Sequence, residues 1–130
     1  MNKFKFNSEF ELRASPKVLF PYLSSASGLQ QWFCEKAINI DSHTLDLIWD
    51  GDHHLAKIVS LRLNKSVKFD FVPVDSEPKD HNYLELRLDT SDLTQSTYLK
   101  ITDYSENSDV TELQELWEEF IYKLKVIVGS

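Results

Sequence analysis

Several residue types are scarce in this chain of 130 residues, and each scarcity excludes a class of protein. A single cysteine, Cys34, cannot form an internal disulfide, which fits a reducing compartment. Three glycines and four prolines are too few for a collagen-like or low-complexity chain, and could hardly supply a phosphate-binding or dinucleotide-binding loop. Basic residues number 14 against 21 acidic ones, and the net charge of -7 disfavours nucleic acid and anionic membrane surfaces as partners.

Long hydrophobic runs are also lacking. No segment approaches the roughly 20 apolar residues of a membrane span, so membrane insertion is not expected. The N-terminus alternates polar and apolar residues where a signal peptide would carry an unbroken apolar stretch, and we therefore expect a cytoplasmic location. Hydrophobic residues still make up 42% of the chain, enough for one core, and the length predicts a single domain over residues 1–130.

The N-terminal quarter predicts one strand and two short helices. A period of two places four apolar side chains on one face of the first strand: Phe4, Phe6, Phe10 and Leu12. Ser15 followed by Pro16 predicts a helix start, because serine can cap free N–H groups and proline already has the helical φ. Small residues at 24–28 end that helix, and a second helical piece is expected at Leu29–Phe33.

The middle of the chain predicts an antiparallel meander of short strands joined by polar turns. The apolar-alternating segments carry Ile38 and Ile40; Leu45, Leu47 and Trp49; Leu55 to Leu63; Val67, Phe69 and Phe71; Leu84, Leu86 and Leu88; and Leu99 and Ile101. Asp50-Gly51 and Asn64-Lys65 are the expected hairpin turns, and the first suits a turn with positive φ. Pro73 to Asn82, with two prolines and three acidic residues, is expected to be a loop.

The strongest local pattern lies at the C-terminus. Asp109 with Glu112 resembles a capping box at a helix start, and Gly129 lies just past the expected helix end. Between them, apolar residues recur at spacings of three and four: Leu113, Leu116, Trp117, Phe120, Ile121, Leu124 and Val128. This pattern predicts an amphipathic helix roughly 30 Å long, enough to cross a sheet.

This order of elements resembles the START-like (helix-grip, SRPBCC) superfamily, which includes proteins similar to the activator of Hsp90 ATPase. The helix Ser-Pro-Lys-Val-Leu-Phe-Pro-Tyr-Leu-Ser and the following Gly28-Leu29-Gln30-Gln31-Trp32-Phe33 look like the family's first helix and its Leu-x-x-Trp-Phe element. The segments 83–87, 93–94, 99–104 and 116–117 resemble a small bacterial subgroup. The resemblance implies an α+β helix-grip fold, in which a curved antiparallel sheet wraps around the long C-terminal helix.

The resemblance also implies a cavity between the sheet and the last helix, usually apolar and open at one end. The candidate lining residues for a small hydrophobic or amphipathic ligand, such as a lipid, are Trp32, Phe33, Leu47, Trp49, Phe69, Phe71, Leu86, Leu99, Ile101, Trp117, Phe120 and Leu124. The same residues could equally fill a solid core, because apolar stripes at strand or helix spacing usually form packed interior. No cofactor is expected.

Nothing in the sequence favours a metal centre or a nucleophile. Paired cysteines and a helical His-x-x-x-His spacing are lacking, so we expect no metal site and assign the histidines to solvated loops. His53 and His54 are adjacent and would point to opposite faces of a strand. Cys34 is expected to be a structural thiol, since Glu35 would raise its pKa although Lys36 could lower it.

Two charged residues stand in the apolar register of their strands. Lys57 shares its register with Leu55 and Val59, and Asp103 shares its register with Leu99 and Ile101, so either could face inward. Such a group in an apolar cavity would be a site candidate. The other strand charges are expected on the solvated face: Asp46, Arg62, Asp70, Glu85 and Arg87.

Three functions are compatible with these observations. The leading hypothesis is a noncatalytic binding domain with no assigned catalytic residues. The second is a chaperone-cofactor-like or homodimerising module, whose acidic surplus suits a protein partner with a basic surface. The third is an enzyme similar to the cyclase or hydrolase members of the superfamily, for which Asp103 is the only nominated group.

Overall fold

The computed structural model describes residues 3–71 and 81–130, and the expected loop at Pro73–Asn82 therefore lies almost wholly outside the described residues. The elements follow in the order β1 (Phe4–Leu12), α1 (Pro16–Ser24), α2 (Ala26–Leu29), β2 (Lys36–Asp41), β3 (Thr44–Trp49), β4 (Asp52–Arg62), β5 (Ser66–Phe71), β6 (Asn82–Thr90), β7 (Thr97–Ser105) and α3 (Val110–Val128). The α+β helix-grip prediction is confirmed.

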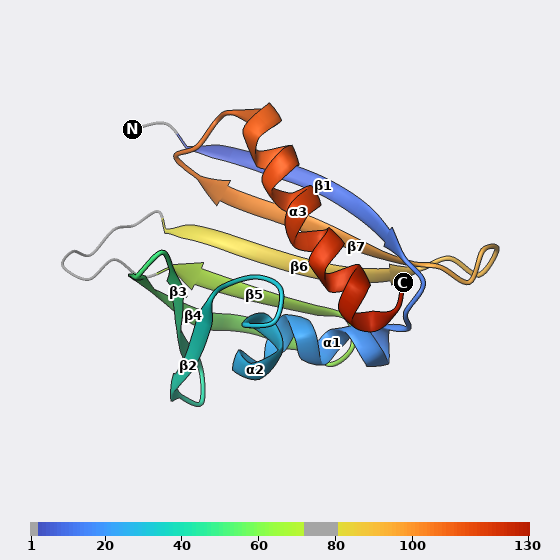
Figure 1. Cartoon of the computed structure of the whole chain (residues 1–130), viewed down its shortest axis with the longest axis horizontal. Coiled ribbons are helices and arrows are strands. Elements are labelled where there is room, and N and C mark those ends of the chain that lie inside the picture. The colour runs from blue at the N-terminus through green and yellow to red at the C-terminus, as the bar shows by residue number, and fades with distance from the viewer. Residues whose placement is uncertain (1–2, 72–80) are drawn as a thin grey trace.

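The strands form one seven-stranded antiparallel sheet in the order β1-β7-β6-β5-β4-β3-β2 (Figure 1). Strands β2 to β7 pair in succession, as the meander predicted, and β1 closes the other edge by pairing with β7. The predicted turns are both present: Asp50 and Gly51 have φ of 50° and 81°, and Asn64 has φ of 59°. These left-handed conformations suit the Asp-Gly and Asn residues that occupy them.

The first helix begins as predicted, and the second begins earlier than predicted. Ser15 Oγ accepts a hydrogen bond from the Val18 amide at 3.2 Å, and Pro16 is the first helical residue. The Leu29–Phe33 assignment is wrong, because Ser25 Oγ accepts from the Gly28 amide at 3.0 Å and starts α2 at Ala26. A Cβ on Gly28 would collide with the α1 backbone, so the missing side chain lets the two helices touch.

Helix α3 crosses the sheet face and buries one stripe of side chains: Leu113, Trp117, Ile121 and Leu124 (Figure 1). Asp109 Oδ1 accepts from the Glu112 amide at 3.0 Å, as the capping pattern predicted. The reciprocal half of the box is replaced, because the Asp109 amide donates to Asn107 Oδ1 at 2.9 Å. Gly129 ends the helix with φ of 75°.

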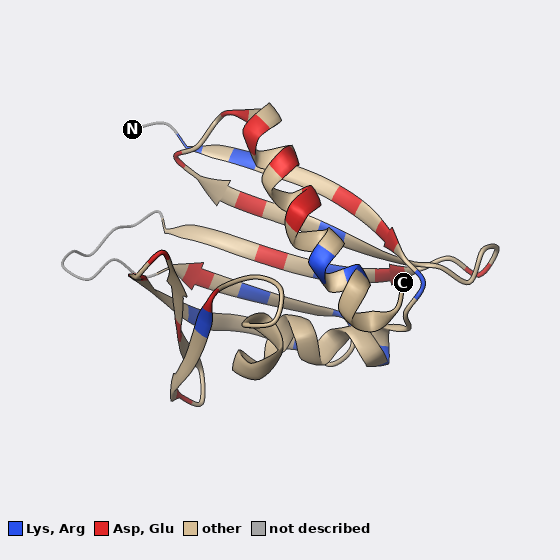
Figure 2. Cartoon of the chain, viewed as in Figure 1, with Lys and Arg blue, Asp and Glu red and all other residues tan. Residues whose placement is uncertain are grey.

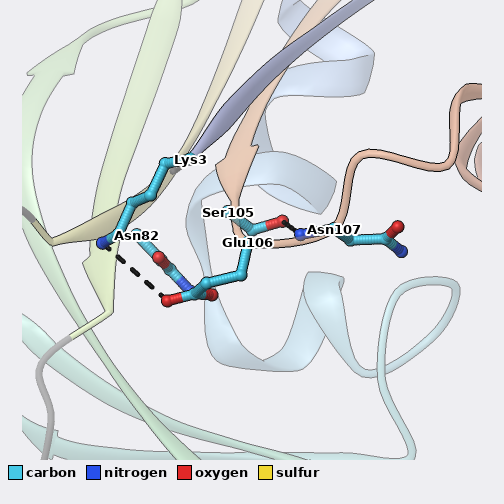
Figure 3. Close-up of polar contacts among 5 residues, drawn as sticks. All are labelled: Lys3, Asn82, Ser105, Glu106 and Asn107. Atoms are coloured by element: carbon cyan, nitrogen blue, oxygen red, sulfur yellow. Dashed lines mark hydrogen bonds and ion pairs between the residues drawn. The ribbon is translucent and has the colours of Figure 1, made fainter. Parts of the chain in front are cut away.

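The segment between β7 and α3 is tied to the sheet by polar contacts (Figure 3). Glu106 accepts from Asn82 Nδ2 at 2.9 Å and lies 4.0 Å from Lys3 Nζ, while Ser105 Oγ accepts from the Asn107 amide at 3.2 Å. The Asn82 hydrogen bond is the main reason why the pKa of Glu106 lies below its ordinary value. These contacts fix the point from which α3 starts.

One inward-facing prediction on β4 is wrong. Lys57 is exposed, and the inner face of this strand carries Ala56, which is fully buried, and Ile58. Leu55 shares the outer register with Lys57, and Val59 is exposed at the register shift, so apolar residues of β4 lie outside its buried face as well as on it. A register shift between Ile58 and Ser60 adds to the irregularity of this strand.

The outer face of the sheet is less polar at its β2 edge than the sequence suggests. Ile38 and Ile40 of β2 are exposed, whereas Ala37 faces the core. Asp46, expected on the solvated face, points outward but is only 9% exposed, and its Oδ2 lies 2.6 Å from His53 Nδ1. His54 takes the opposite, inner register beside Leu47, so the prediction that the two histidines diverge is confirmed. Their assignment to a loop is wrong, because β4 begins at Asp52 and contains both.

Candidate functional site

A pocket of about 270 Å³ opens between the sheet and the first half of α3. Its lining residues are Phe33, Trp49, Phe71, Leu84, Asp103, Leu116, Trp117 and Phe120. Trp49 and Phe71 end β3 and β5, and Leu84 stands near the start of β6, which are positions at the same end of an antiparallel sheet. The pocket is therefore built where these strand ends meet the helix.

The rings of Phe33, Trp49, Trp117 and Phe120 form a continuous cluster with Phe33 at its centre. The Phe33 ring is nearly parallel to that of Trp117, with centroids 5.5 Å apart and an angle of 22°. Trp49 and Phe120 meet it edge to face at 5.0 and 5.1 Å, and Trp117 meets Phe120 at 5.3 Å. Offset and edge-to-face pairs of this kind each add about 0.5–1.5 kcal/mol beyond area burial. The rings thus support one another as a fixed wall.

Hydrogen bonds hold the indoles of this wall in place. Trp49 Nε1 donates to the Phe33 carbonyl at 2.6 Å, which connects the end of β3 to the turn after α2. Trp32 lies behind the wall and donates to the Tyr22 carbonyl at 2.8 Å. Because each of these N–H groups has an acceptor, burying the ring leaves no unpaired donor.

Asp103 is the one ionisable side chain among the described residues that line the pocket. The register of β7 allowed Asp103 to face inward, and the structure places its side chain in the pocket lining. Trp117 Nε1 donates to Asp103 Oδ2 at 3.1 Å. Burial raises the pKa of Asp103, and the hydrogen bond from Trp117 offsets part of that rise. A carboxyl group that lacks a second titratable partner in the described lining does not make an acid–base pair.

The twelve candidate lining residues divide into two groups. Five of them line the pocket: Phe33, Trp49, Phe71, Trp117 and Phe120. The other seven are at most 2% exposed and belong to the packed core: Trp32, Leu47, Phe69, Leu86, Leu99, Ile101 and Leu124. The two interpretations, cavity lining and solid core, thus each apply to a different part of the interior. The ligand-binding role of the five lining residues stays a prediction.

Three lining residues were not among those candidates: Leu84, Asp103 and Leu116. Leu84 shares the inward register of Leu86, and Leu116 borders the apolar stripe of α3. Both residues therefore belong to apolar patterns that the sequence already showed. The register of β7 made Asp103 a possible inward charge in the cavity, although Asp103 was not named among the lining residues. The sequence did not indicate where along the sheet the pocket lies.

Cys34 lies outside the lining and behaves as a structural thiol. Its side chain is buried among core residues, and burial raises its pKa to about 11. Hydrogen bonds from the backbone of Ile48 and Lys36 lower the pKa in part, and the nearby Glu35 raises it. The thiolate needed for nucleophilic chemistry is therefore disfavoured.

None of the helices that the structure describes is both long and apolar enough to cross a membrane.

Comparison with known proteins identifies relatives of the whole chain. A family model described as a START-like superfamily domain matches residues 1–130. The solution structure of the Aha1 dimer from Colwellia psychrerythraea is similar with a TM-score of 0.78 at 19% identity, over 96% of each chain. BfR322 from Bacteroides fragilis has a TM-score of 0.64 at 29% identity, over 98% of this chain and 92% of its own.

A further neighbour is DynU16, a protein in the dynemicin biosynthetic locus. It has a TM-score of 0.73 at 15% identity, over 97% of this chain and 48% of its own. No match was found among curated proteins. Likeness at 15% and 19% identity supports the fold alone, so the function is argued from the site.

Proposed function

The chain belongs to the START-like superfamily, and from this we propose that it is a noncatalytic module that holds a small hydrophobic or amphipathic molecule between the sheet and α3. The observation that carries the proposal is the pocket of about 270 Å³, whose lining has seven apolar side chains and one carboxyl group. Ligand sites are typically concave and apolar with a few polar groups. The modest volume favours a compact molecule over a long acyl chain.

The rigidity of the pocket wall supports binding without rearrangement. Phe33 is held from three sides by Trp49, Trp117 and Phe120, and the Trp49 indole is hydrogen-bonded to the Phe33 backbone. A preformed site does not have to order its side chains when the ligand arrives, so less of the binding free energy is spent on conformational entropy. The apolar surface that the ligand would cover provides the driving force.

The first test is native mass spectrometry of the purified protein, with organic extraction of any bound molecule. A stoichiometric apolar or amphipathic molecule would support the proposal and identify its chemical class. Tryptophan fluorescence then measures affinity, because Trp49 and Trp117 line the pocket and a bound ligand should change their emission saturably. An empty protein without a saturable response to compact apolar and amphipathic compounds would contradict the proposal.

A pocket-filling substitution makes the test specific. Leu116 lines the pocket and is 40% exposed, so Leu116→Trp should occupy the hollow without disrupting the core. The matched control is Val126→Trp, which adds an indole to the same helix at a site that is 64% exposed and outside the pocket. Leu116→Trp should abolish ligand binding and Val126→Trp should preserve it. Equal binding by both variants would place the ligand elsewhere.

A protein-interaction module is the second candidate. It is favoured by apolar side chains exposed on β2 and at the β4–β5 end, of which Ile40, Leu61 and Leu63 are each more than half exposed, and by the dimer reported for the Colwellia Aha1 structure. Sedimentation velocity of the native chain and of Ile40→Lys separates the candidates. A native dimer that Ile40→Lys converts to a monomer would support this second function. A native chain that is monomeric at all concentrations would contradict homodimerisation.

A further inference from the structure

We propose that the pocket selects an organic cation, namely a protonated amine on a compact apolar body, with Asp103 as the group that pairs with the ammonium. This inference rests on the proposed binding function and names the chemical class of its ligand. The observations that carry it are the position of Asp103 in the pocket wall, the aromatic rings around it, and the charges of the surrounding surface.

Asp103 is placed to receive a hydrogen-bond donor. Only one of its oxygens, Oδ2, is engaged by Trp117 Nε1, at 3.1 Å. Its cross-strand neighbours are Phe6 on β1 and Leu84 on β6, which offer no donor side chain. The described structure records no ion pair of this carboxylate. An ammonium group in the pocket would supply the missing countercharge through a charge-assisted hydrogen bond.

The rest of the pocket wall is suited to a cation as well as to an apolar body. Phe33, Phe71, Trp49, Trp117 and Phe120 all line it, and the face of an aromatic ring attracts a cation within about 6 Å of its centre. This attraction grows when the cation is removed from water. The same rings offer apolar contact area to the remainder of the ligand, so an amine with a hydrocarbon or aromatic body satisfies both properties.

The charges of the wall and of the adjoining helix oppose an anionic ligand. Neither Lys nor Arg occurs among the described lining residues, so a carboxylate or phosphate would meet Asp103 without a countercharge. The first half of α3 exposes only acidic charges, at Glu112, Glu115, Glu118 and Glu119, and its lysines begin at Lys123 (Figure 2). An acidic surface beside a pocket raises the local concentration of cations. An anionic amphipathic molecule such as a fatty acid is therefore not the ligand class that this pocket favours.

The burial of Asp103 is costly, which fits a binding role better than a structural one. Burial raises the pKa of this carboxyl group, because the ionised form is less well solvated inside the protein than in water. Leucine or asparagine would avoid that penalty at the same place in β7. Strained or destabilising polar groups that persist in clefts are candidates for function, since stability and activity often oppose each other there.

Three compounds with the same phenylpropyl body test the inference by isothermal titration calorimetry at pH 7.5. They are 3-phenylpropan-1-amine, 3-phenylpropan-1-ol and 3-phenylpropanoate, which carry a cation, a neutral donor and an anion. The amine should bind about tenfold more tightly than the alcohol, or about 1.4 kcal/mol, and the carboxylate should bind most weakly. This series uses the native chain and needs no variant to fold.

Asp103→Asn then assigns the selectivity to one residue. The amide oxygen can still accept from Trp117, so the wall is retained while the charge is removed. The ratio of the amine affinity to the alcohol affinity should fall close to one, and the alcohol affinity itself should stay unchanged. The control Glu11→Gln removes the same charge from the exposed side of β1, five positions from the residue that pairs with Asp103, and should keep the selectivity.

The outcomes separate this inference from the function on which it rests. Equal binding of the amine and the alcohol, or unchanged selectivity in Asp103→Asn, would overturn the cation assignment and leave the apolar pocket intact as a binding site. Failure of all three compounds, together with no extractable ligand, would contradict both proposals. An amine preference that Leu116→Trp abolishes and Asp103→Asn removes would support both.

Discussion

The indole N–H of Trp49 donates a 2.6 Å hydrogen bond to the backbone carbonyl of Phe33. Trp49 ends β3, and Phe33 belongs to the turn that follows α2, so the bond joins the sheet to the helical layer beside the pocket. The two rings also meet edge to face at 5.0 Å. One side chain thus positions the residue around which the aromatic wall is organised.

Trp49→Phe should destabilise the protein by about 1–2 kcal/mol, because the Phe33 carbonyl loses its donor and the smaller phenyl ring fills less of the space that the indole occupies. Urea unfolding followed by circular dichroism measures the change. Tyr122→Phe is the matched control, since it removes one polar group from an aromatic ring that is exposed on α3, and should change stability by less than about 0.5 kcal/mol. Equal effects of the two substitutions would show that the hydrogen bond has no structural importance.

Gly28→Ala should destabilise the protein by about 1–3 kcal/mol or more, because the new methyl group would overlap the backbone of Pro21 and Tyr22 and force α1 and α2 apart. Thermal unfolding of the variant gives the loss. Ser27→Ala changes the neighbouring, exposed position of the same helix and serves as the comparison. A Gly28→Ala protein as stable as Ser27→Ala would mean that α1 and α2 leave room for a methyl group between them.

Asp103→Asn should raise the free energy of unfolding at neutral pH, and the gain should disappear in acid. Burial raises the folded-state pKa of Asp103 above its unfolded value, so the folded protein binds this proton more tightly. The contribution of the native carboxyl group is therefore most favourable below the unfolded pKa and is lost as pH rises through the folded pKa.

The measurement is the difference in unfolding free energy between Asp103→Asn and the native chain from about pH 3 to pH 7. Taking the difference removes the other acidic groups from the comparison. Phe6, Leu84 and Trp117, which face Asp103 from β1, β6 and α3, do not titrate in this range. A difference that is flat with pH, or that grows in acid, would contradict a raised pKa of Asp103 in the folded protein.

Cys34 should resist alkylation in the folded protein. With the pKa raised to about 11, about one thiol in a thousand is ionised at pH 8, and the side chain is only 8% exposed. Iodoacetamide should therefore modify Cys34 much more slowly in buffer than in urea, as mass spectrometry would measure. Similar rates in both solvents would show that the site opens readily.

Much of the fold was predictable because local patterns and tertiary contacts agree. The alternation in β1, the Ser15-Pro16 start of α1, the Asp50-Gly51 turn and the apolar stripe of α3 each predicted an element that the structure contains. The failures occurred where local patterns were ambiguous. Small residues before Gly28 suggested a helix end although Ser25 caps a new helix there, and β4 has apolar residues on both faces.

The sequence by itself determined the order of the elements and the meander, because strand and helix periods are local properties of the chain. The same period put both Lys57 and Asp103 in an apolar register, and only the structure decided that Asp103 lines the pocket while Lys57 is exposed. Only the tertiary structure decided which aromatic residues enclose space. Phe69 and Phe71 share one face of β5, yet Phe69 is core and Phe71 lines the pocket, because the hollow lies at the strand ends where α3 meets the sheet. A residue's distance from that junction depends on strand pairing and helix placement across the whole molecule, which no local period encodes.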